Sequence, residues 1–166
     1  MTIAQAIVAE FQFESAATRK FLERFEDRHA DWQPHEKSMS ASRLATHVVE
    51  CPDWAYTILD ADDFDLATMD YQPPHWKTRA DLIENHARIG AGFLKQFEGR
   101  SDDLMRGTWR LLQGDQVLME TTREAAVRNI VLSHLVHHRG QLSVYYRLLG
   151  IPVPGPYGPS ADDQDG

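Results

Sequence analysis

The fold is decided by one stretch of sequence, Ser133-His134-Leu135-Val136-His137-His138-Arg139-Gly140-Gln141. It lies within a segment from about Thr122 to Leu149 whose apolar residues return at helical spacing. Gly150 and the prolines after it end that segment, because glycine favours the left-handed helix end and proline cannot continue a helix. The sequence therefore predicts one long carboxy-terminal helix with histidines near its middle.

Two of these histidines, His134 and His138, are one helical turn apart, and side chains at that spacing can reach a common point. At roughly 100° per residue, the apolar residues that lie within about 60° of His134 are Val127, Val131, Tyr145 and Leu148. A lone inward histidine is usually satisfied by a hydrogen bond from a neighbour. Two on one seam need several partners when neutral and repel each other when charged, whereas a shared cation with a third ligand solves both problems.

The pattern thus predicts one divalent metal ion between helices. His47 is the expected third ligand, because it lies with Leu44 and Cys51 on the apolar stripe of an earlier helix. His137 is also within reach of His134, and periodicity alone leaves it open as a ligand. Three imidazoles suit Zn or Ni best in our interpretation, and Fe, Mn or Cu are alternatives.

Three further helices are predicted before the histidine-rich one. The first runs from about Thr2 to Arg28, the second from a Ser40 cap to about Asp60, and the third from Thr78 to about Phe97. Pro52 is expected to kink the second helix near His47, unless a helix restarts there. On the third helix, the predicted inward residues are Ile83, Ala87, Gly90, Leu94 and Phe97.

The expected architecture is all-α, an up-and-down four-helix bundle. A small β-hairpin is predicted between the third and fourth helices, because Gln113-Gly114-Asp115-Gln116 is turn-like and has apolar residues on both sides. With 166 residues, we expect a single domain over 1–166 whose residues from about 151 to 166 form an irregular tail rich in proline and glycine.

The composition argues against several kinds of partner. A net charge of −8, from 17 Lys+Arg against 25 Asp+Glu, opposes binding to nucleic acid phosphates. We find no run of eighteen apolar residues and no secretory leader, so a membrane partner is not expected. The single cysteine, Cys51, cannot form an internal disulfide. A cytoplasmic location is therefore expected.

The motifs resemble those of the DinB/YfiT-like superfamily. The run from His134 to Leu142 with Leu149-Gly150-Ile151-Pro152-Val153-Pro154 is similar to its carboxy-terminal signature, and Trp32 to Met39 followed by Leu44-Ala45-Thr46-His47 is similar to its first ligand segment. The resemblance implies a four-helix bundle with a three-histidine metal site, usually in a homodimer. Matched motif to motif, the ligands are His47, His134 and His138, which decides against His137.

Some members of that superfamily are metal-dependent thiol transferases or thiol-dependent isomerases. Three histidine ligands leave coordination positions open, as in catalytic sites, and a metal there favours the thiolate form of a bound thiol. The favoured hypothesis is a metal-dependent enzyme that acts on a small molecule by thiol (S-)transfer, with a low-molecular-weight thiol as partner. The alternatives are a metal-dependent hydrolase, a non-catalytic stress-related metal- or ligand-binding protein, and a simple dimerisation module.

Other residues have both a functional and an ordinary interpretation. Gln141 can contact a metal-bound water or substrate, or make an interhelical contact. Cys51 can supply a thiolate, although a lone cysteine on an apolar face is more often a small buried residue. Gly140 suggests the close approach of another helix. His86 and Glu14 can line the cavity or be polar residues at helix edges.

The remaining histidines and three tryptophans are interpreted structurally. We expect solvated histidines in or beside connectors and tryptophans in the core, with a pocket wall as the alternative for the latter. These residues are His29, His35 and His75, and Trp54, Trp76 and Trp109.

Overall fold

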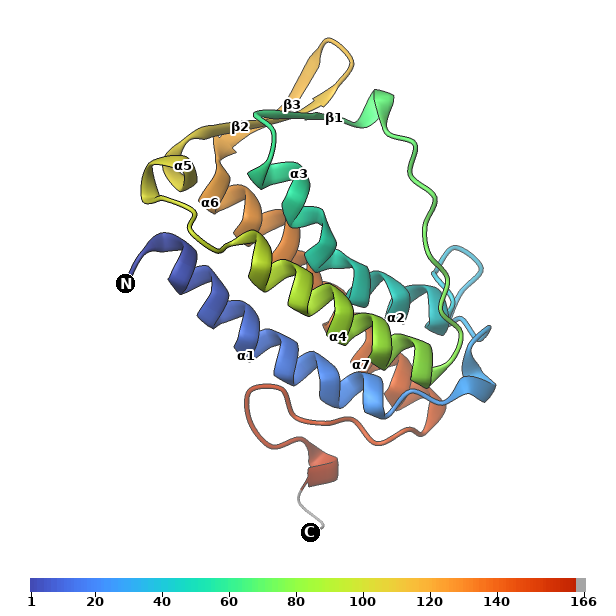
Figure 1. Cartoon of the computed structure of the whole chain (residues 1–166). Helices are drawn as coiled ribbons and strands as arrows, with labels where there is room; N and C mark the ends of the chain where they lie inside the picture. The colour runs from blue at the N-terminus through green and yellow to red at the C-terminus, as the bar shows by residue number, and fades with distance from the viewer. Residues whose placement is uncertain (164–166) are drawn as a thin grey trace.

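The computed structural model describes residues 1–163 and is mostly helical, with a small sheet at one end (Figure 1). Most helices begin where a serine or threonine side chain accepts a backbone N–H: Thr2 caps α1, Ser40 caps α2 and Thr78 caps α4. The α-helices are α1 (Ile3–Glu23), α2 (Ala41–Glu50), α3 (Ala55–Leu59), α4 (Arg79–Gln96), α5 (Asp102–Arg106), α6 (Arg123–Ala126) and α7 (His134–Leu149).

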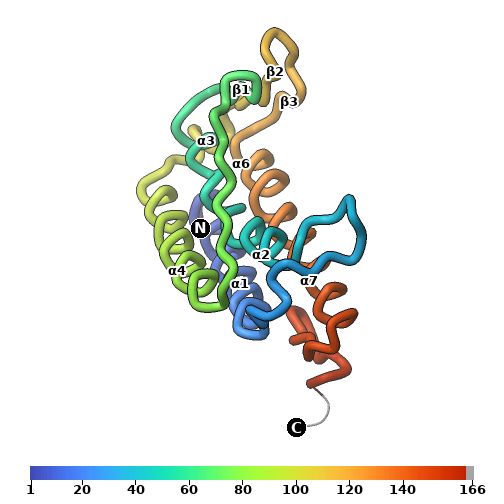
Figure 2. The backbone as a smooth tube through the Cα atoms, turned by 90° about the vertical axis from the view of Figure 1, so that its right-hand side faces the viewer, coloured from blue at the N-terminus to red at the C-terminus, as the bar shows by residue number. Residues whose placement is uncertain are grey.

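The long helices lie side by side, and α2 packs against both α4 and α7 (Figures 1 and 2). The core has one cluster of buried apolar residues near the sheet and a second towards the opposite end of the helices. The predicted helical class is confirmed. A strict four-helix bundle is not confirmed, because the fold also contains the short helix α5 and a sheet. The first helix also ends at Glu23, before the predicted Arg28.

The sheet has three strands among the described residues. β2 (Thr108–Gln113) and β3 (Gln116–Thr122) form the predicted hairpin, with Gly114 at a φ of +57° in its turn. β1 (Asp63–Asp65) pairs in parallel with β2 and was not predicted, because three residues are too few to show an alternating pattern. Trp109 anchors the sheet: it is buried, as predicted, and its indole N–H donates to the Thr57 carbonyl at 3.0 Å.

The second predicted helix is interrupted where Pro52 indicated. α2 ends at Glu50, a 3₁₀ turn covers Cys51–Trp54, and α3 restarts at Ala55. Proline lacks the amide that would continue the α-helical ladder, but it fits the first turn of a new helix. His47 therefore lies in the last turn of regular α-helix before the break.

The last predicted helix is continuous from Arg123 to Leu149 but not uniform. A π-helical segment, Val127–Ser133, joins α6 to α7. Helical periodicity did not indicate this segment, since one extra residue in a turn only shifts the apolar pattern. Gly150, at a φ of +71°, ends α7 as predicted. Leu148, which the sequence analysis places on the same apolar face as His134, is instead 61% exposed.

The inward face of α4 differs from the prediction by about one residue. The side chains that it buries, together with Phe97 just beyond its end, are Leu82, His86, Ile89 and Phe93. Ala87 is exposed, and Gly90, Ile83 and Leu94 lie only at the edge. The error is a rotation of roughly 100°, because apolar residues on both flanks of the true stripe blurred its centre. His86 is therefore buried. Its ring lies 3.1 Å from the Ser15 hydroxyl, and burial lowers its pKa to about 4.

Among the described residues, no other helix approaches Gly140 closely, contrary to the prediction. A Cβ built there would meet no heavy atom within 4 Å among the described residues. The segment 151–160 is irregular, as predicted, and a 3₁₀ turn covers Ala161–Asp163. The rest of the predicted tail, 164–166, lies outside the described residues. Within the described part of the chain, no helix is long and apolar enough to cross a membrane.

A buried ion pair joins α7 to α1. Arg139, 2% exposed, donates from Nη2 to a Glu14 carboxylate oxygen at 2.6 Å and from Nη1 to the Thr18 hydroxyl at 3.1 Å. The Tyr157 hydroxyl, from the segment after α7, lies 2.6 Å from Arg139 and 3.0 Å and 3.1 Å from the two Glu14 carboxylate oxygens. Glu14 therefore holds this arginine and does not line the histidine site.

This ion pair predicts a large effect of Glu14→Ala on stability. The substitution leaves the Arg139 charge buried without its carboxylate, which costs roughly 3–5 kcal/mol of unfolding free energy. Glu23→Ala, on the same helix, removes an ion pair to Arg19 in which both side chains are 49% exposed, and costs about 0.5 kcal/mol. Urea denaturation of both variants measures the difference; equal losses would contradict it.

Candidate metal centre

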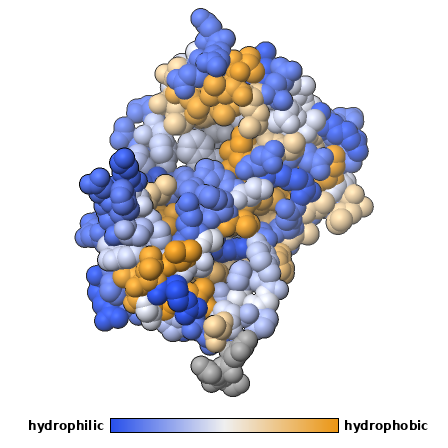
Figure 3. Space-filling view, turned by 180° about the vertical axis from the view of Figure 1, so that it is seen from behind, coloured by the Kyte–Doolittle hydropathy of each residue, from blue (hydrophilic) through white to orange (hydrophobic). Residues whose placement is uncertain are grey.

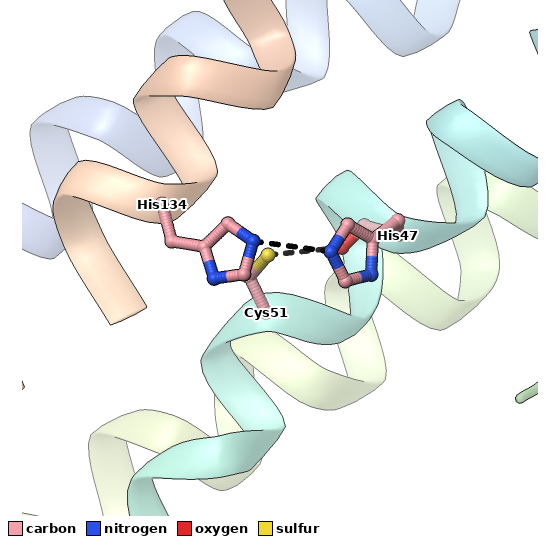
Figure 4. A group of neighbouring side chains, drawn as sticks. All are labelled: His47, Cys51 and His134. Carbon is pink, nitrogen blue, oxygen red and sulfur yellow. Dashed lines mark hydrogen bonds between the residues drawn. The ribbon is translucent and has the colours of Figure 1, made fainter. Parts of the chain in front are cut away.

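The candidate site lies between α2 and α7. His47 projects from α2 and His134 from the start of α7, and Figure 4 shows their rings pointing toward each other across the gap between the helices. His138 follows one turn along α7. The sequence places all three there because α2 and α7 present their apolar stripes to each other, and these histidines interrupt the stripes.

Their Nε2 atoms face one another at short distances. His47 Nε2 lies 3.2 Å from His134 Nε2, and His134 Nε2 lies 2.7 Å from His138 Nε2. The ring centroids of His47 and His138 are 4.5 Å apart. Nitrogens bound to one tetrahedral ion at 2.0–2.1 Å are about 3.3 Å apart. The distance between His47 and His134 matches this value. The His134 and His138 rings need to move only slightly apart to reach it.

The opposite nitrogens of the rings are held by acceptors. His47 Nδ1 lies 2.5 Å from Glu50 Oε1, and His138 Nδ1 lies 2.7 Å from Gln141 Oε1. The His134 ring hydrogen-bonds the backbone of Ile130. A carboxylate and an amide oxygen accept only, so Nδ1 of His47 and of His138 carries the proton. In the neutral rings, the Nε2 atoms of these two histidines therefore present lone pairs.

Lone pairs that face one another repel, and protonation is opposed as well. Burial lowers the pKa of His134, and it lowers that of His138 to about 4, with the neighbouring histidines adding to both shifts. Near neutral pH His134 and His138 are therefore uncharged and have no proton to share between their facing atoms. Three unprotonated imidazole nitrogens directed at one point are a donor set for a divalent cation, with their Nδ1 partners fixing the ring orientations.

Glu50 supports this arrangement and was missed by the sequence reasoning. Its side chain is 5% exposed, and it accepts from His47, from both terminal nitrogens of Arg43 at 2.9 Å, and from the Tyr71 hydroxyl at 2.6 Å. Burial alone would raise its pKa, but these hydrogen bonds outweigh burial and hold the pKa below its usual value. A glutamate three residues after a helical histidine is the signal that could have indicated it.

Cys51 lies beside the histidines, one turn after His47. Its Sγ is within 4.8 Å of the ligand atoms of His47 and His134, so the three side chains form a compact group (Figure 4). The thiol donates to the His47 carbonyl at 3.0 Å, and burial raises its pKa. A thiol occupied in this way behaves as the small buried residue that sequence analysis favoured.

The other predicted residues are distributed as follows. Gln141 is exposed but contacts His138, while His137 is exposed and its ring centroid lies 4.9 Å from that of His138. His86 faces α1, not this site. Of the connector histidines, His35 and His75 are exposed and His29 is partly buried; of the tryptophans, Trp109 lies in the core, whereas Trp54 and Trp76 are partly buried and line a cavity.

The cluster opens onto a cleft of about 430 Å³. His138 and Gln141 form one side, and the loop of Lys37, Ser38 and Met39 forms another. Leu44, Val144 and Tyr145 complete the lining. The Tyr145 hydroxyl donates to the Met39 carbonyl at 3.1 Å, which fixes the loop beside α7. A small molecule in this cleft would contact the edge of the histidine cluster.

The fold and the site define a helical protein with a candidate histidine metal centre between two of its helices. The chain belongs to the DinB family, whose family model matches residues 1–165. It is 24% identical over 154 residues to the uncharacterized protein YrdA of Bacillus subtilis (strain 168), covering 92% of this chain and 87% of that protein.

Two solved structures have the same fold. One is a DinB-like protein from Bacillus cereus ATCC 10987, with a TM-score of 0.71, 18% identity and coverage of 91% of this chain and 95% of that one. The other is the DinB-like protein YjoA from Bacillus subtilis, with a TM-score of 0.66, 20% identity and coverage of 89% and 95%. At these identities the likeness extends to the fold alone.

The geometry predicts that the purified protein carries close to one divalent ion per chain. His134→Ala or His138→Ala leaves only two converging imidazoles, and each variant is expected to lose most of the bound metal on dialysis. Elemental mass spectrometry on dialysed protein measures the occupancy. Full occupancy in both variants would contradict the site.

His137→Ala is the matched test of which neighbouring histidine binds. Its side chain is exposed and takes no part in the contacts between the facing Nε2 atoms, so metal content is expected to equal that of the wild type. Loss of metal in this variant, with His138→Ala unaffected, would reverse the assignment. Cys51→Ala serves as a second control and is also expected to retain the ion.

Proposed function

We propose that this protein binds a divalent metal ion through His47, His134 and His138 and is a metal-dependent enzyme that acts on a small molecule. The observation that supports this proposal best is the convergence of the three Nε2 atoms, with ring orientations fixed from behind by Glu50 and Gln141. Zn or Ni is the favoured ion, because borderline-soft cations suit imidazole.

Thiol transfer is the chemistry we favour. A divalent ion bound at the three histidines supplies a positive charge that favours the thiolate form of a thiol at neutral pH. The chain's contribution is to bind and orient the small molecule. Met39, Val144 and Tyr145 offer apolar contact in the cleft, Lys37 offers a cation for an anionic group, and the amide nitrogen of Gln141 can donate a hydrogen bond.

Hydrolysis is the second candidate, and the cleft argues against it. Hydrolysis needs a base to take a proton from water, yet no carboxylate lines the cleft among the described residues. The nearest buried carboxylate, Glu50, is fully engaged by His47, Arg43 and Tyr71. A non-catalytic metal-binding protein is the third candidate, and it predicts that chelation unfolds the helices.

We also propose that the protein forms a homodimer. On α7, Val144 and Leu148 are one turn apart and are 56% and 61% exposed. Figure 3, which views the molecule from behind, shows apolar patches interspersed with polar surface. Large exposed apolar residues at helical spacing fit pairing through a helix face. Analytical ultracentrifugation tests this proposal, and a mass of 19.0 kDa at all micromolar concentrations would exclude it.

The thiol proposal predicts a spectral change in cobalt-substituted protein. Cys51→Ser is used so that its own sulfur cannot contribute, and free cysteine is compared with free serine, which differs only in the coordinating atom. Cysteine is expected to produce a sulfur-to-cobalt charge-transfer absorption at millimolar concentration, because a divalent ion stabilises the thiolate. Serine should produce none.

The control variant is His138→Ala, which should bind too little cobalt to respond. If cysteine leaves the spectrum of the loaded protein unchanged, thiol transfer is excluded and the hydrolytic or binding function takes its place. Circular dichroism of the chelated protein separates those two: an enzyme site emptied of metal leaves the helices folded, and a structural site does not.

A further inference from the structure

A second cavity, of about 270 Å³, lies on the side of α2 that faces α4 and the connector between β1 and α4. Figure 2 shows that connector as an extended segment running beside the helices. The cavity is lined by residues of the connector, of the 3₁₀ turn after α2 and of α4. The residues that matter below are Asp53, Trp54, Asp70, Tyr71, Trp76 and Arg88.

The walls of this cavity are aromatic. The rings of Trp54 and Tyr71 are 5.1 Å apart and tilted by 57°, and Trp76 lies on the same lining. All three are only partly buried, so part of their surface is free to contact a ligand. Polar residues therefore surround an aromatic surface. Sites that bind organic cations have this composition.

These walls are held in place before any ligand binds. The Tyr71 hydroxyl donates to Glu50 at 2.6 Å and lies 3.3 Å from Arg43. Trp76 is fixed through its backbone, because its amide donates to the Thr46 hydroxyl at 3.0 Å and its carbonyl accepts from the same group at 3.2 Å. A rigid aromatic site loses little entropy on binding, which favours affinity for a small ligand.

The charge at the mouth of the cavity is negative. Asp53 and Asp70 are exposed, and neither forms a salt bridge within residues 1–163. The one cation on the lining, Arg88, donates to Asn85 on its own helix. Glu50 is already neutralised by Arg43. Two unpaired carboxylates beside aromatic faces attract a cation and repel an anion.

We propose that this cavity binds a small organic cation, an alkylammonium or quaternary ammonium group. Aromatic faces attract such a cation through their quadrupoles and need no hydrogen-bond acceptors in return. The aspartates add long-range attraction at the entrance. A bare divalent metal fits less well, because rings cannot replace its shell of oxygen ligands. The site lies on the other side of α2 from the histidine cluster and is linked to it through Glu50.

Choline and 3,3-dimethylbutan-1-ol are the matched probes, since they have nearly the same shape and differ in charge. Isothermal titration calorimetry with the full chain is expected to give at least about tenfold tighter binding of choline. Asp53→Asn and Asp70→Asn each remove one charge without touching the core and should weaken choline by about threefold. Asp115→Asn, in the β2–β3 turn, is the control and should have no effect.

Trp54→Leu should abolish the preference for choline over its neutral isostere, because it removes an aromatic face and keeps the apolar bulk. His138→Ala should leave choline binding unchanged, which separates this site from the metal centre. Equal affinity for the two probes, no heat with choline up to tens of millimolar, or identical binding by the two aspartate variants and the wild type would each overturn the proposal.

Discussion

The buried ion pair between Arg139 and Glu14 is the constraint on which the arrangement of α7 depends. Neighbouring residues on a helix point about 100° apart, so α7 must be covered on two flanks to bury both His138 and Arg139. α1 covers one flank with Glu14 and Thr18, and α2 covers the other with its apolar stripe. Rotation of α7 would withdraw the guanidinium from its only carboxylate in the described chain. The direction of the histidines is therefore fixed from the opposite side of the helix.

Glu50 connects the two sites discussed above. Its Oε1 accepts from His47 at the candidate metal centre, and its Oε2 accepts from Tyr71 at the aromatic cavity. The Arg43 guanidinium makes this burial tolerable, because it offsets the carboxylate charge where little water is present. One buried residue thus orients a candidate metal ligand on one side of α2 and an aromatic wall on the other. The orientation of the His47 ring and the position of the connector are parts of the same hydrogen-bond network.

The helices and the pairing of His134 with His138 could be predicted from the sequence because both depend on local spacing. The spacing of His134 and His138, the caps at Ser40 and Thr78, and the break at Pro52 each act within a turn or two of helix. What could not be predicted depends on distant partners: the third strand, the Arg139 ion pair and the role of Glu50. The face of α4 was misplaced for a different reason. Its apolar residues cover a wide arc, and only contact with α1 decides that Phe93 and His86 are central. Gly140 shows that a small residue in a helix can simply lie in open space.

The π-helical segment Val127–Ser133 sets the phase between the two halves of the last helix. The half of the last helix near the sheet buries Ala126 and Val127. The half near the carboxy terminus buries Leu142 and Tyr146 at the far end of the core. Each residue of an α-helix turns the chain by about 100°, so the extra residue of a wide turn offsets one stripe from the other by that angle. Without it, a helix docked by its sheet end would present His134 and His138 to a different neighbour. An insertion or deletion in a solvent-facing loop changes only the length of that loop. In this helix it rotates the residues that follow, so it changes the direction in which the histidines point.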